Sequence, residues 1–419
     1  MKLLPFQQKI LDATEHKNKV AYYLDMGLGK TFIGGEKLKQ LNARKNLVVC
    51  QKSKIDDWIK HFNEHYGLFY DVLDLTKKKG YETFLKLEGS CIGVINYDLA
   101  FRRKELLELS DFTLMLDESQ FIKSDKAKRT KFILKLDFKN VILLSGTPTG
   151  GKYEDLWTQC RLLGWNITKT EFWERYINYR LYSPAPNVYP IKLVTGYKNI
   201  KDLKQSLKIL GAVFMKTSEV IELPEQVFTV IESKTSREYR EFETKKIVIV
   251  DDTELVGDNT LKHLLYMRQL CSVYSKEKLA AFKDWVESND NRLIVFYNFT
   301  SELNHLVEAV KERPISIVNG EKKDLNSYEN YDNSVTFVQY QAGAMGLNLQ
   351  KANYIAYYSL PLASDLFEQS KKRIHRIGQA ETCFYYLFVC KDSVEEHILN
   401  TLKERRDYTE ILFSKRYLL

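Results

Sequence analysis

The stretch Asp25-Met26-Gly27-Leu28-Gly29-Lys30-Thr31 decides how the N-terminal half of this chain is expected to fold. It follows a short apolar and aromatic run, residues 20–24, which predicts a buried strand. It precedes an amphipathic run, residues 31–41, which predicts a helix. A strand, a glycine loop ending in Lys-Thr and a helix form the arrangement of a phosphate-binding loop.

Each residue type in this loop has a chemical reason to be there. Glycines let backbone N–H groups curl around an anion, and the helix N-terminus adds its positive end. Lys30 supplies a charge for the β- and γ-phosphates, and the Thr31 hydroxyl is placed to bind Mg²⁺. The pattern G-x-x-x-x-G-K-[ST] is incomplete, because Leu24 occupies the position of its first glycine. An ordinary tight turn is the alternative, and the flanking strand and helix favour phosphate binding.

The size and charge of the chain set the outer limits. With 419 residues, 44% of them hydrophobic, two domains with real cores are expected. The net charge of +8 fits an acidic partner such as nucleic acid, although many enzymes are mildly basic without one.

The cysteines and the N-terminus indicate the compartment. Six scattered cysteines form no C-x-x-C pair, which indicates buried thiols in a reducing compartment and neither disulfides nor a zinc site. Pro5, Gln7 and Gln8 stand where a signal peptide needs an apolar core, and no run approaches membrane-spanning length. We therefore expect a soluble, cytoplasmic or otherwise intracellular protein without a membrane partner.

Short apolar strands alternate with helical stretches along most of the chain, which predicts an α/β fold with parallel sheets covered by helices. In the first half the expected strands are 20–24, 46–50, 91–95, 112–116 and 140–144, and the expected helices are 31–41, 53–65, 98–108 and 126–135. In the second half the expected strands are 292–297, 315–318, 334–339, 353–357 and 382–389, and the expected helices are 235–246, 276–287, 300–312, 363–375 and 392–412.

This rhythm gives a provisional domain plan. Residues 1–216 form an N-terminal lobe, in which 150–210 is a helical and aromatic insertion. Residues 217–260 form a linker with a helical segment, and residues 261–419 form a C-terminal lobe.

A strand over 112–116 ends in two carboxylates, Asp117 and Glu118. A carboxylate in this place holds Mg²⁺, and a neighbouring Glu orients the attacking water. The alternative is an acidic helix N-terminus after a strand, where acids are favoured anyway. Together with the glycine loop, the pair indicates a nucleotide hydrolase. The next strand ends in Ser145-Gly146-Thr147-Pro148, which is either a plain turn or a hydroxyl link from the nucleotide site to a second ligand.

Three further segments leave two interpretations each. Arg373 and Arg376 lie three residues apart on one face of a predicted helix, which suits arginine fingers on a γ-phosphate or a solvated basic face. The run His61-Phe62-Asn63-Glu64-His65 matches an inverted zinc-protease pattern, which we reject in favour of a satisfied or exposed pair of histidines, because short patterns recur by chance. Basic and aromatic residues interleave over 169–201, as in a nucleic-acid surface or, slightly favoured, a small subdomain with its aromatics packed inward.

Taken together, these segments resemble one family, the superfamily-two helicase-type translocases of the Swi/Snf group, in the family's order over nearly the whole chain. The matching segments are Leu4–Gln7, Asp25–Thr31, Leu47–Trp58, Asp117–Gln120, Ser145–Pro148, Met215–Thr217 with Leu223–Pro224, Met267–Cys271, Val295–Phe299, Ala342–Leu349 and Arg373–Gln379. The chain departs from the family at Gln51 (usually Pro), at Ser119 and Gln120 (usually the A-H of D-E-A-H), at Lys216 (usually Arg) and at Lys372 (usually Gly).

The resemblance implies two RecA-like lobes with ATP and Mg²⁺ in the cleft between them. It implies catalytic roles for Lys30, Asp117, Glu118, Gln120, Arg373 and Arg376. It implies nucleotide contacts from Gln7, Met26, Gly27, Leu28, Gly29, Lys30, Thr31 and Gly346, with Thr31 and Asp117 on the metal. It implies DNA contacts from Lys52, Ser53, Ser145, Thr147, Asn298, Ala342 and Asn348.

The function that follows is ATP-driven movement along double-stranded DNA, typically without strand separation, by a minimal motor without accessory domains. Two alternatives stay open: an RNA or single-stranded DNA helicase, and an ATP-switched assembly protein that binds nucleic acid. Protein partners, translocation direction and oligomeric state are not indicated by the sequence.

Overall fold

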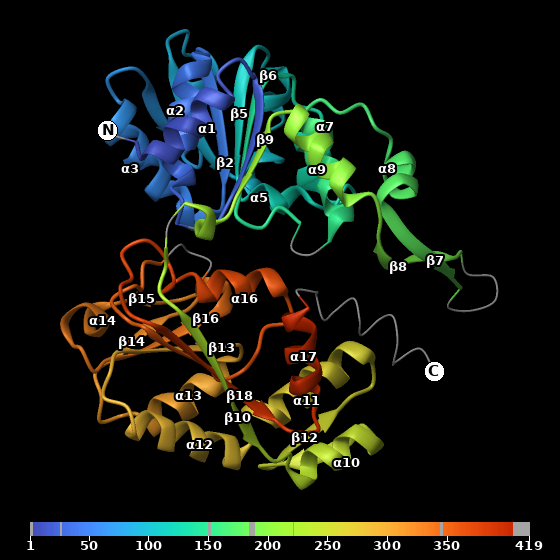
Figure 1. Cartoon of the computed structure of the whole chain (residues 1–419), viewed down its shortest axis with the longest axis vertical. Helices are drawn as coiled ribbons and strands as arrows, with labels where there is room; N and C mark the ends of the chain where they lie inside the picture. Colours follow the sequence, from blue (N-terminus) through green and yellow to red (C-terminus); the bar gives the residue numbers. More distant parts are fainter. Residues whose placement is uncertain are drawn as a thin grey trace. The chain divides into compact units, whose positions relative to one another are not determined.

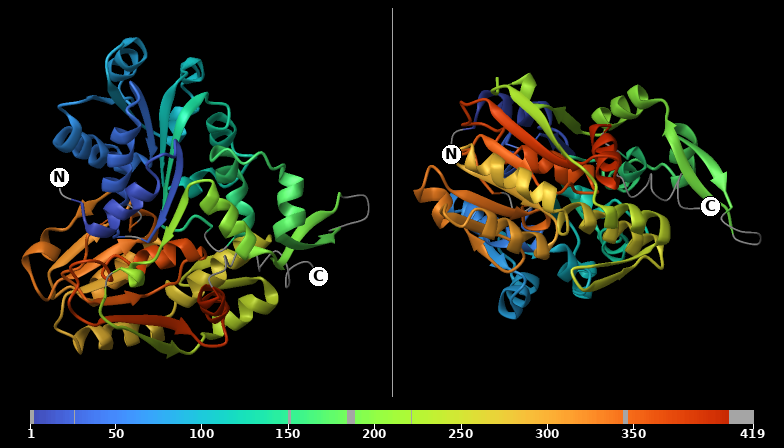
Figure 2. Two further views of the ribbon diagram at one scale, coloured as in Figure 1. Left: turned by 45° about the horizontal axis from the view of Figure 1, so that its top comes forward. Right: turned by 90° about the horizontal axis from the view of Figure 1, so that it is seen from below.

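The computed structural model describes residues 3–25, 27–149, 152–183, 189–220, 222–343 and 347–404. The chain divides into two compact units, Met1–Ile221 and Glu222–Leu419, each with its own sheet (Figures 1 and 2). The predicted α/β class with two sheets is therefore confirmed.

The first unit is built on a parallel seven-stranded sheet in the order β3-β4-β2-β5-β6-β1-β9. Its strands are β1 (Lys19–Leu24), β2 (Lys45–Cys50), β3 (Asp71–Asp74), β4 (Cys91–Asn96), β5 (Phe112–Asp117), β6 (Phe138–Ser145) and β9 (Ala212–Met215). Its helices are α1 (Pro5–Ala13), α2 (Lys30–Leu41), α3 (Ile55–Tyr66), α4 (Lys78–Lys86), α5 (Tyr97–Ala100), α6 (Lys128–Ile133), α7 (Trp157–Leu162), α8 (Lys169–Tyr176) and α9 (Ile200–Ile209).

Alternation of side chains along β1 shows that both faces of this sheet are buried. Ala21 and Tyr23 belong to one apolar cluster, whereas Val20, Tyr22 and Leu24 belong to another. Because successive residues of a strand point to opposite faces, helices must cover the sheet on both sides. The carboxyl ends of its parallel strands lie at one edge, which is where open α/β sheets bind ligands.

The second unit has a seven-stranded sheet in the order β10-β18-β17-β13-β16-β14-β15, parallel except for the β14–β15 pair. Its strands are β10 (Gln226–Ser233), β13 (Leu293–Tyr297), β14 (Ile315–Val318), β15 (Lys323–Asp324), β16 (Val335–Gln339), β17 (Tyr354–Tyr357) and β18 (Cys383–Cys390), with a separate hairpin of β11 (Ile247–Val250) and β12 (Thr253–Val256). Its helices are α10 (Arg237–Lys245), α11 (Thr260–Ser272), α12 (Lys276–Glu287), α13 (Thr300–Ala309), α14 (Asn326–Asn330), α15 (Tyr340–Gly343), α16 (Ser364–Lys371) and α17 (Val394–Lys403).

Most expected strands and helices are present, and the differences are local. β3, α4 and β9 were not expected from the sequence, and β10 lies within the segment predicted as a linker. The expected helix 98–108 is two short helices, α5 and a 3₁₀ turn, Lys104–Glu108. The expected helix 392–412 begins at Val394 and is described as far as Lys403.

The helix predicted over 363–375 is wrong at its end, because α16 stops at Lys371. Arg373 and Arg376 therefore lie in the turn that follows and do not share a helix face. The carbonyl of Arg373 accepts the N–H of Leu349 at 3.1 Å, which ties this turn to the loop before β17. At Gly378 the backbone has φ +95°, a conformation that favours glycine and breaks the helical path.

The insertion expected over 150–210 contains α7, α8, α9 and a two-stranded antiparallel ribbon, β7 (Ile177–Tyr182) and β8 (Ile191–Tyr197). Among the described residues, no helix is long and apolar enough to cross a membrane.

Candidate functional site

The glycine loop occupies the carboxyl end of β1 and leads directly into α2, which starts at Lys30. Gly27 and Gly29 have φ +89° and +73°, so the loop needs residues that adopt left-handed backbone. The Lys30 ammonium donates to the carbonyls of Leu24 at 3.0 Å and Asp25 at 3.4 Å. Lys30 is thus held at the strand end, over the loop that it is predicted to serve.

Gln7 packs directly against the loop. Its Nε2 donates to the Leu28 carbonyl at 3.1 Å, and its Oε1 accepts the N–H of Leu4 at 2.9 Å. A Cβ built on Gly29 would lie 2.3 Å from Gln7 Nε2, so only glycine permits this approach. The structure therefore brings Gln7 to the glycine loop, as expected of a residue that contacts the nucleotide base.

The carboxylate pair follows β5. Asp117 ends the strand, and its Oδ2 accepts the indole N–H of Trp58 at 2.8 Å. Burial and the neighbouring Glu118 carboxylate raise the pKa of Asp117 to about 6, against the lowering effect of the Trp58 donor. Glu118 has φ +51°, an uncommon conformation for a residue with a Cβ and one that often marks functional sites.

A chain of hydrogen bonds runs from Glu118 to the turn after β6. Gln120 Nε2 donates to Glu118 Oε2 at 2.8 Å, and Ser145 Oγ donates to Gln120 Oε1 at 2.8 Å. The N–H of Thr147 in turn donates to Ser145 Oγ at 3.1 Å. Gln120 therefore bridges the carboxylate pair and the Ser145–Pro148 turn, even though it stands where the family usually has His.

The predicted nucleic-acid residues of the first unit differ in exposure. Lys52 and Ser53 are exposed in a 3₁₀ turn, Lys52–Lys54, directly after β2. Ser145 is fully buried, so within the turn that it begins the half-buried Thr147 is the more accessible residue.

Sequence reasoning missed several supports of this site. Trp58 falls inside a quoted motif, yet nothing in the pattern showed that its N–H reaches Asp117. Asp25 Oδ2 accepts the N–H of Thr217 at 3.1 Å across 192 residues of sequence. Gln159 Oε1 accepts hydrogen bonds from Tyr23 at 3.0 Å and Ser119 at 2.7 Å. No local signal predicts such contacts, because they depend on which strands are neighbours.

In the second unit the two predicted arginines have different surroundings. Arg373 is 3% exposed, whereas Arg376 is partly exposed and its Nη1 donates to Asn348 Oδ1. Burial lowers the pKa of Arg376. Arg376 and Asn348 are thus brought together, although they were assigned to different ligands.

Other predicted residues of this unit serve its interior. Asn298 Nδ2 donates to Ser359 Oγ at 2.9 Å and to the Leu360 carbonyl at 3.0 Å. Ala342 is 2% exposed, so its side chain reaches no external ligand. Met26 and Gly346 lie outside the described residues.

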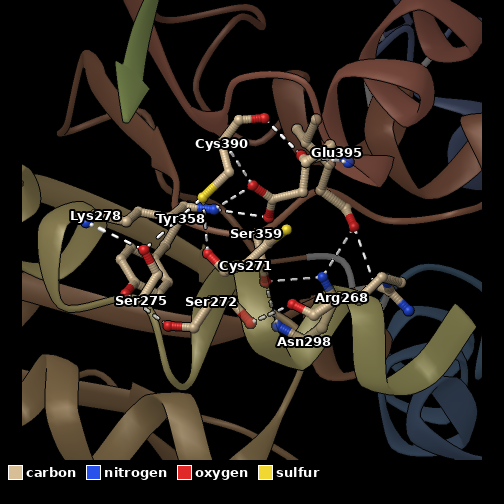
Figure 3. Close-up of polar contacts among 12 residues, drawn as sticks. Arg268, Cys271, Ser272, Ser275, Lys278, Asn298, Tyr358, Ser359, Cys390 and Glu395 are labelled. Carbon is tan, nitrogen blue, oxygen red and sulfur yellow. Dashed lines mark hydrogen bonds and ion pairs between the residues drawn. The ribbon is translucent and has the colours of Figure 1, made fainter. Parts of the chain in front are cut away.

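Figure 3 shows a buried polar cluster in the second unit, which contains Cys271, Cys390 and Glu395. Among the described residues, only these three have potential ligand atoms close enough to one another to bind a single metal ion. Lys278 Nζ lies 2.6 and 2.7 Å from the two oxygens of Glu395. Because this ammonium already supplies a positive charge there, the donor set does not fit a metal.

For His61 and His65, the structure shows an aromatic environment. Their ring centroids are 4.9 Å apart, and His61 also contacts the rings of Phe32, Trp58 and Phe62. Burial, and to a smaller extent His65, lowers the pKa of His61 to about 4.

The sheet, the glycine loop after β1 and the carboxylate pair after β5 are together typical of an α/β nucleotide hydrolase, and a second α/β unit accompanies them. The model of the SNF2-related domain matches residues 23–277, and the model of the helicase conserved C-terminal domain matches residues 277–378. The chain belongs to the SNF2-related family and is a helicase-family enzyme that hydrolyses ATP.

Relatives are similar over almost the whole chain. An uncharacterized ATP-dependent helicase of Bacillus subtilis, YqhH, is 24% identical over 96% of this chain and 78% of its own length. An uncharacterized ATP-dependent helicase of Mycoplasma pneumoniae is 23% identical over 91% of this chain and 39% of its own length. A SWI/SNF-related regulator of chromatin subfamily A-like protein 1 homolog of Caenorhabditis elegans is 23% identical over 97% of this chain and 61% of its own length. The Sulfolobus solfataricus SWI2/SNF2 ATPase core solved with dsDNA is 19% identical, with a TM-score of 0.49 over 99% of this chain and 94% of that one.

Proposed function

We propose that this chain is an ATP-driven translocase on double-stranded DNA that moves along the duplex without separating its strands. The observation that carries the proposal is the hydrogen-bonded chain Glu118–Gln120–Ser145–Thr147. One end is the carboxylate predicted to act on the water, and the other is the turn predicted to contact DNA. A ligand that shifts this turn therefore changes the position of the catalytic carboxylate.

The residues present fit ATP and Mg²⁺. A Cβ built on Gly29 would lie 2.3 Å from Gln7 Nε2, and glycines in such a loop let main-chain N–H groups turn toward an anion. Thr31 and Asp117 offer hydroxyl and carboxylate oxygens, which are the ligands that Mg²⁺ prefers. In this assignment Lys30 binds the β- and γ-phosphates, and Glu118 orients the water and accepts its proton. The metal, when bound, neutralises charge on the phosphates.

That Arg373 and Arg376 act on the same nucleotide stays a prediction from the family resemblance. An arginine finger contributes about 10³–10⁵ in kcat. Arg376→Ala is therefore expected to lose hydrolysis and keep most ATP binding, measured by single-turnover hydrolysis beside equilibrium binding of a fluorescent ATP analogue. Normal hydrolysis in Arg376→Ala would remove this arginine from the mechanism.

The decisive experiment compares ATP hydrolysis by the full chain with duplex DNA, single-stranded DNA, RNA or no nucleic acid. Duplex DNA is expected to stimulate most, and a strand-separation assay is expected to be negative while a triplex-displacement assay is positive. Stronger stimulation by RNA or single strands would favour the helicase alternative. ATP binding without turnover on any nucleic acid would favour the ATP-switched assembly protein.

Two variants connect this experiment to the site. Glu118→Gln is expected to abolish turnover and keep ATP binding, with Glu64→Gln as its control, because Glu64 is an exposed carboxylate on α3. Gln120→Ala removes the bridge and is expected to reduce stimulation by duplex more than unstimulated hydrolysis. Equal loss of both rates in Gln120→Ala would refute the coupling role of the bridge.

A further inference from the structure

We propose that the β7–β8 ribbon and α9 form a second nucleic-acid-binding element, which holds duplex DNA through its phosphates. We call residues 175–183 and 189–210 the basic arm. This inference rests on the proposed function, since it takes duplex DNA as the ligand. It assigns DNA binding to a part of the first unit that lies outside the predicted contact residues.

The charge of the basic arm stands out from the rest of the chain. Its 31 residues contain seven Lys or Arg and one acidic residue, Asp202, which gives a net charge of +6. The whole chain carries +8, so the other 388 residues together contribute only +2. Concentration of like charge on one element is the electrostatic signature of a phosphate-binding surface.

The single acid does not offset these cations. Asp202 Oδ2 accepts the hydroxyl of Tyr176 at 2.7 Å and lies 3.0 Å from Arg175 Nη2. The six remaining cations are all exposed, and none forms a salt bridge with a carboxylate in the described part of the chain: Arg180, Lys192, Lys198, Lys201, Lys204 and Lys208. On α12 and α3, by contrast, Lys283 pairs with Glu287 and Lys60 with Glu64. Exposed cations that form no salt bridge favour an external anionic partner.

The aromatic residues of this region divide into an anchored set and an outer set. Phe172 and Tyr176 on α8 are fully buried in the core of the first unit and fix the base of the ribbon. Tyr179 lies on the ribbon, and the Lys192 ammonium is 4.2 Å from the centre of its ring. The interpretation of inward-packed aromatics therefore holds for Phe172 and Tyr176, whereas the ribbon beyond them exposes its cations and keeps Tyr179 half-buried against Trp173.

The shape of the ribbon suits a DNA groove. Its strands pair antiparallel from Ile177 opposite Tyr197 to Tyr182 opposite Ile191, with an irregularity between Asn178 and Tyr179. The major groove of B-DNA, about 12 Å wide, admits a two-stranded ribbon of this kind. In both Figure 1 and Figure 2 the ribbon extends away from the first sheet beyond α8, so a duplex has access to it within this unit.

The outer end of the ribbon carries exposed apolar side chains, which fit the groove as well. Leu181 is 65% exposed, Ile191 49% and Tyr189 93%. Apolar groups at the tip of a basic ribbon can contact thymine methyl groups or wedge against a base step, while the cations around them bind phosphates. A second copy of this chain could instead cover these apolar side chains, and sedimentation of a variant distinguishes the two cases.

The test reverses three cations of the basic arm in the full chain, as Arg180→Glu/Lys192→Glu/Lys198→Glu. The matched control is Lys79→Glu/Lys86→Glu/Lys276→Glu, which changes three exposed lysines elsewhere by the same formal charge. Binding of a fluorescent 40-base-pair duplex is measured by anisotropy, without ATP, from about 50 to 200 mM salt. ATP hydrolysis without DNA serves as the folding check, because the arm lies outside the nucleotide-binding loop.

The arm variant is expected to bind duplex about 10- to 100-fold more weakly than the wild type. Its slope of log Kobs against log salt is expected to be shallower by about 2 to 3, since each lost phosphate contact removes about 0.9. The control is expected to stay within about twofold to threefold of the wild type, because it keeps the phosphate contacts and changes only the overall charge. Equal binding and equal slope in the arm variant and the control would overturn the proposal.

Two further outcomes separate this inference from the proposed function. If duplex stimulates the wild type and the arm variant has the control's affinity, the inference fails and the proposed function stands. If the wild type binds duplex through the arm without stimulated hydrolysis, the proposed function fails and the inference stands. Sedimentation of Leu181→Ser/Ile191→Ser tests whether a second copy of the chain covers these side chains. A dimeric wild type and a monomeric variant, together with unchanged duplex binding by the variant, would overturn the inference.

Discussion

Removing one partner of the buried Lys278–Glu395 pair is expected to destabilise the second unit strongly. The Lys278 side chain on α12 is 0% exposed, and that of Glu395 at the start of α17 is 3% exposed. Both carboxylate oxygens of Glu395 contact the Lys278 ammonium, and Oε2 also accepts the N–H of Cys390 at 2.9 Å (Figure 3). Burial favours the neutral form of Lys278, yet the adjacent carboxylate outweighs it, so the pKa of Lys278 lies above its usual value.

The magnitude follows from this geometry. Lys278→Met leaves the Glu395 carboxylate buried with only the Cys390 N–H, and losing one partner of such a pair costs about 3–5 kcal/mol. Lys278→Met/Glu395→Leu removes both charges, and we expect the double variant to recover most of that loss. Lys283→Met is the control on the same helix. Its partner Glu287 lies 3.7 Å away and both side chains are more than half exposed, so we expect a cost below about 0.5 kcal/mol.

Hydrogen exchange measured by mass spectrometry is the suitable assay, because two units need not unfold together. In Lys278→Met, the best-protected amides of α12 and α17 are expected to exchange about 10² to 10³ times faster, whereas peptides of the first sheet stay unchanged. An increase below about fivefold would refute the energetic argument. So would a double variant as unstable as the sum of the two single variants, since the two charges would then act independently.

Three other perturbations have defined outcomes. Trp58→Phe keeps the ring contact with Phe62 but removes the N–H donor to Asp117. ATP hydrolysis by this variant should therefore require about tenfold more Mg²⁺, as measured by a metal titration. An unchanged Mg²⁺ dependence would contradict this role of Trp58. Burial lowers the pKa of His61 to about 4. Below about pH 6.5 the unfolded chain therefore takes up a proton at this residue while the folded chain does not. The free energy of unfolding should fall by about 1 kcal/mol between pH 7 and 5. His61→Leu should flatten this dependence in urea unfolding at the two pH values, and an equal fall in the variant would exclude His61 as its source. Gly93→Ala places a Cβ 2.7 Å from Leu75 and 2.8 Å from Phe84. The free energy of unfolding, measured from the urea midpoint, should therefore fall by about 1–3 kcal/mol. An unchanged midpoint would show that α4 moves freely.

The local patterns were sufficient for much of the fold. The β1 strand, the glycine loop and α2 follow from an apolar run, two glycines and an amphipathic run that are contiguous in sequence. The same holds for α12, whose bounds Lys276–Glu287 match the expected helix. These elements can be predicted locally, because side-chain periodicity and backbone conformation are properties of neighbouring residues.

Other elements needed their surroundings. The edge strand β9 is only four residues long and is fixed by pairing with β1, so no local pattern predicted it. The end of α16 shows the reverse case. The sequence 363–375 favours a helix, but the hydrogen bond from the Leu349 N–H to the Arg373 carbonyl competes with its last turn.

By itself, the sequence determined that this protein has a glycine loop ending in Lys-Thr, a carboxylate pair and the ordered motifs of an SNF2-type enzyme. Only the tertiary structure decided that Gln120 bridges Glu118 to Ser145, that Trp58 holds Asp117 and that Asp25 accepts the N–H of Thr217. It also decided that the cations of the basic arm are exposed and that Phe172 and Tyr176 of α8 are buried. The reason is physical: residue types fix which chemistry is available, whereas the order of strands in the sheet fixes which side chains come within hydrogen-bonding distance.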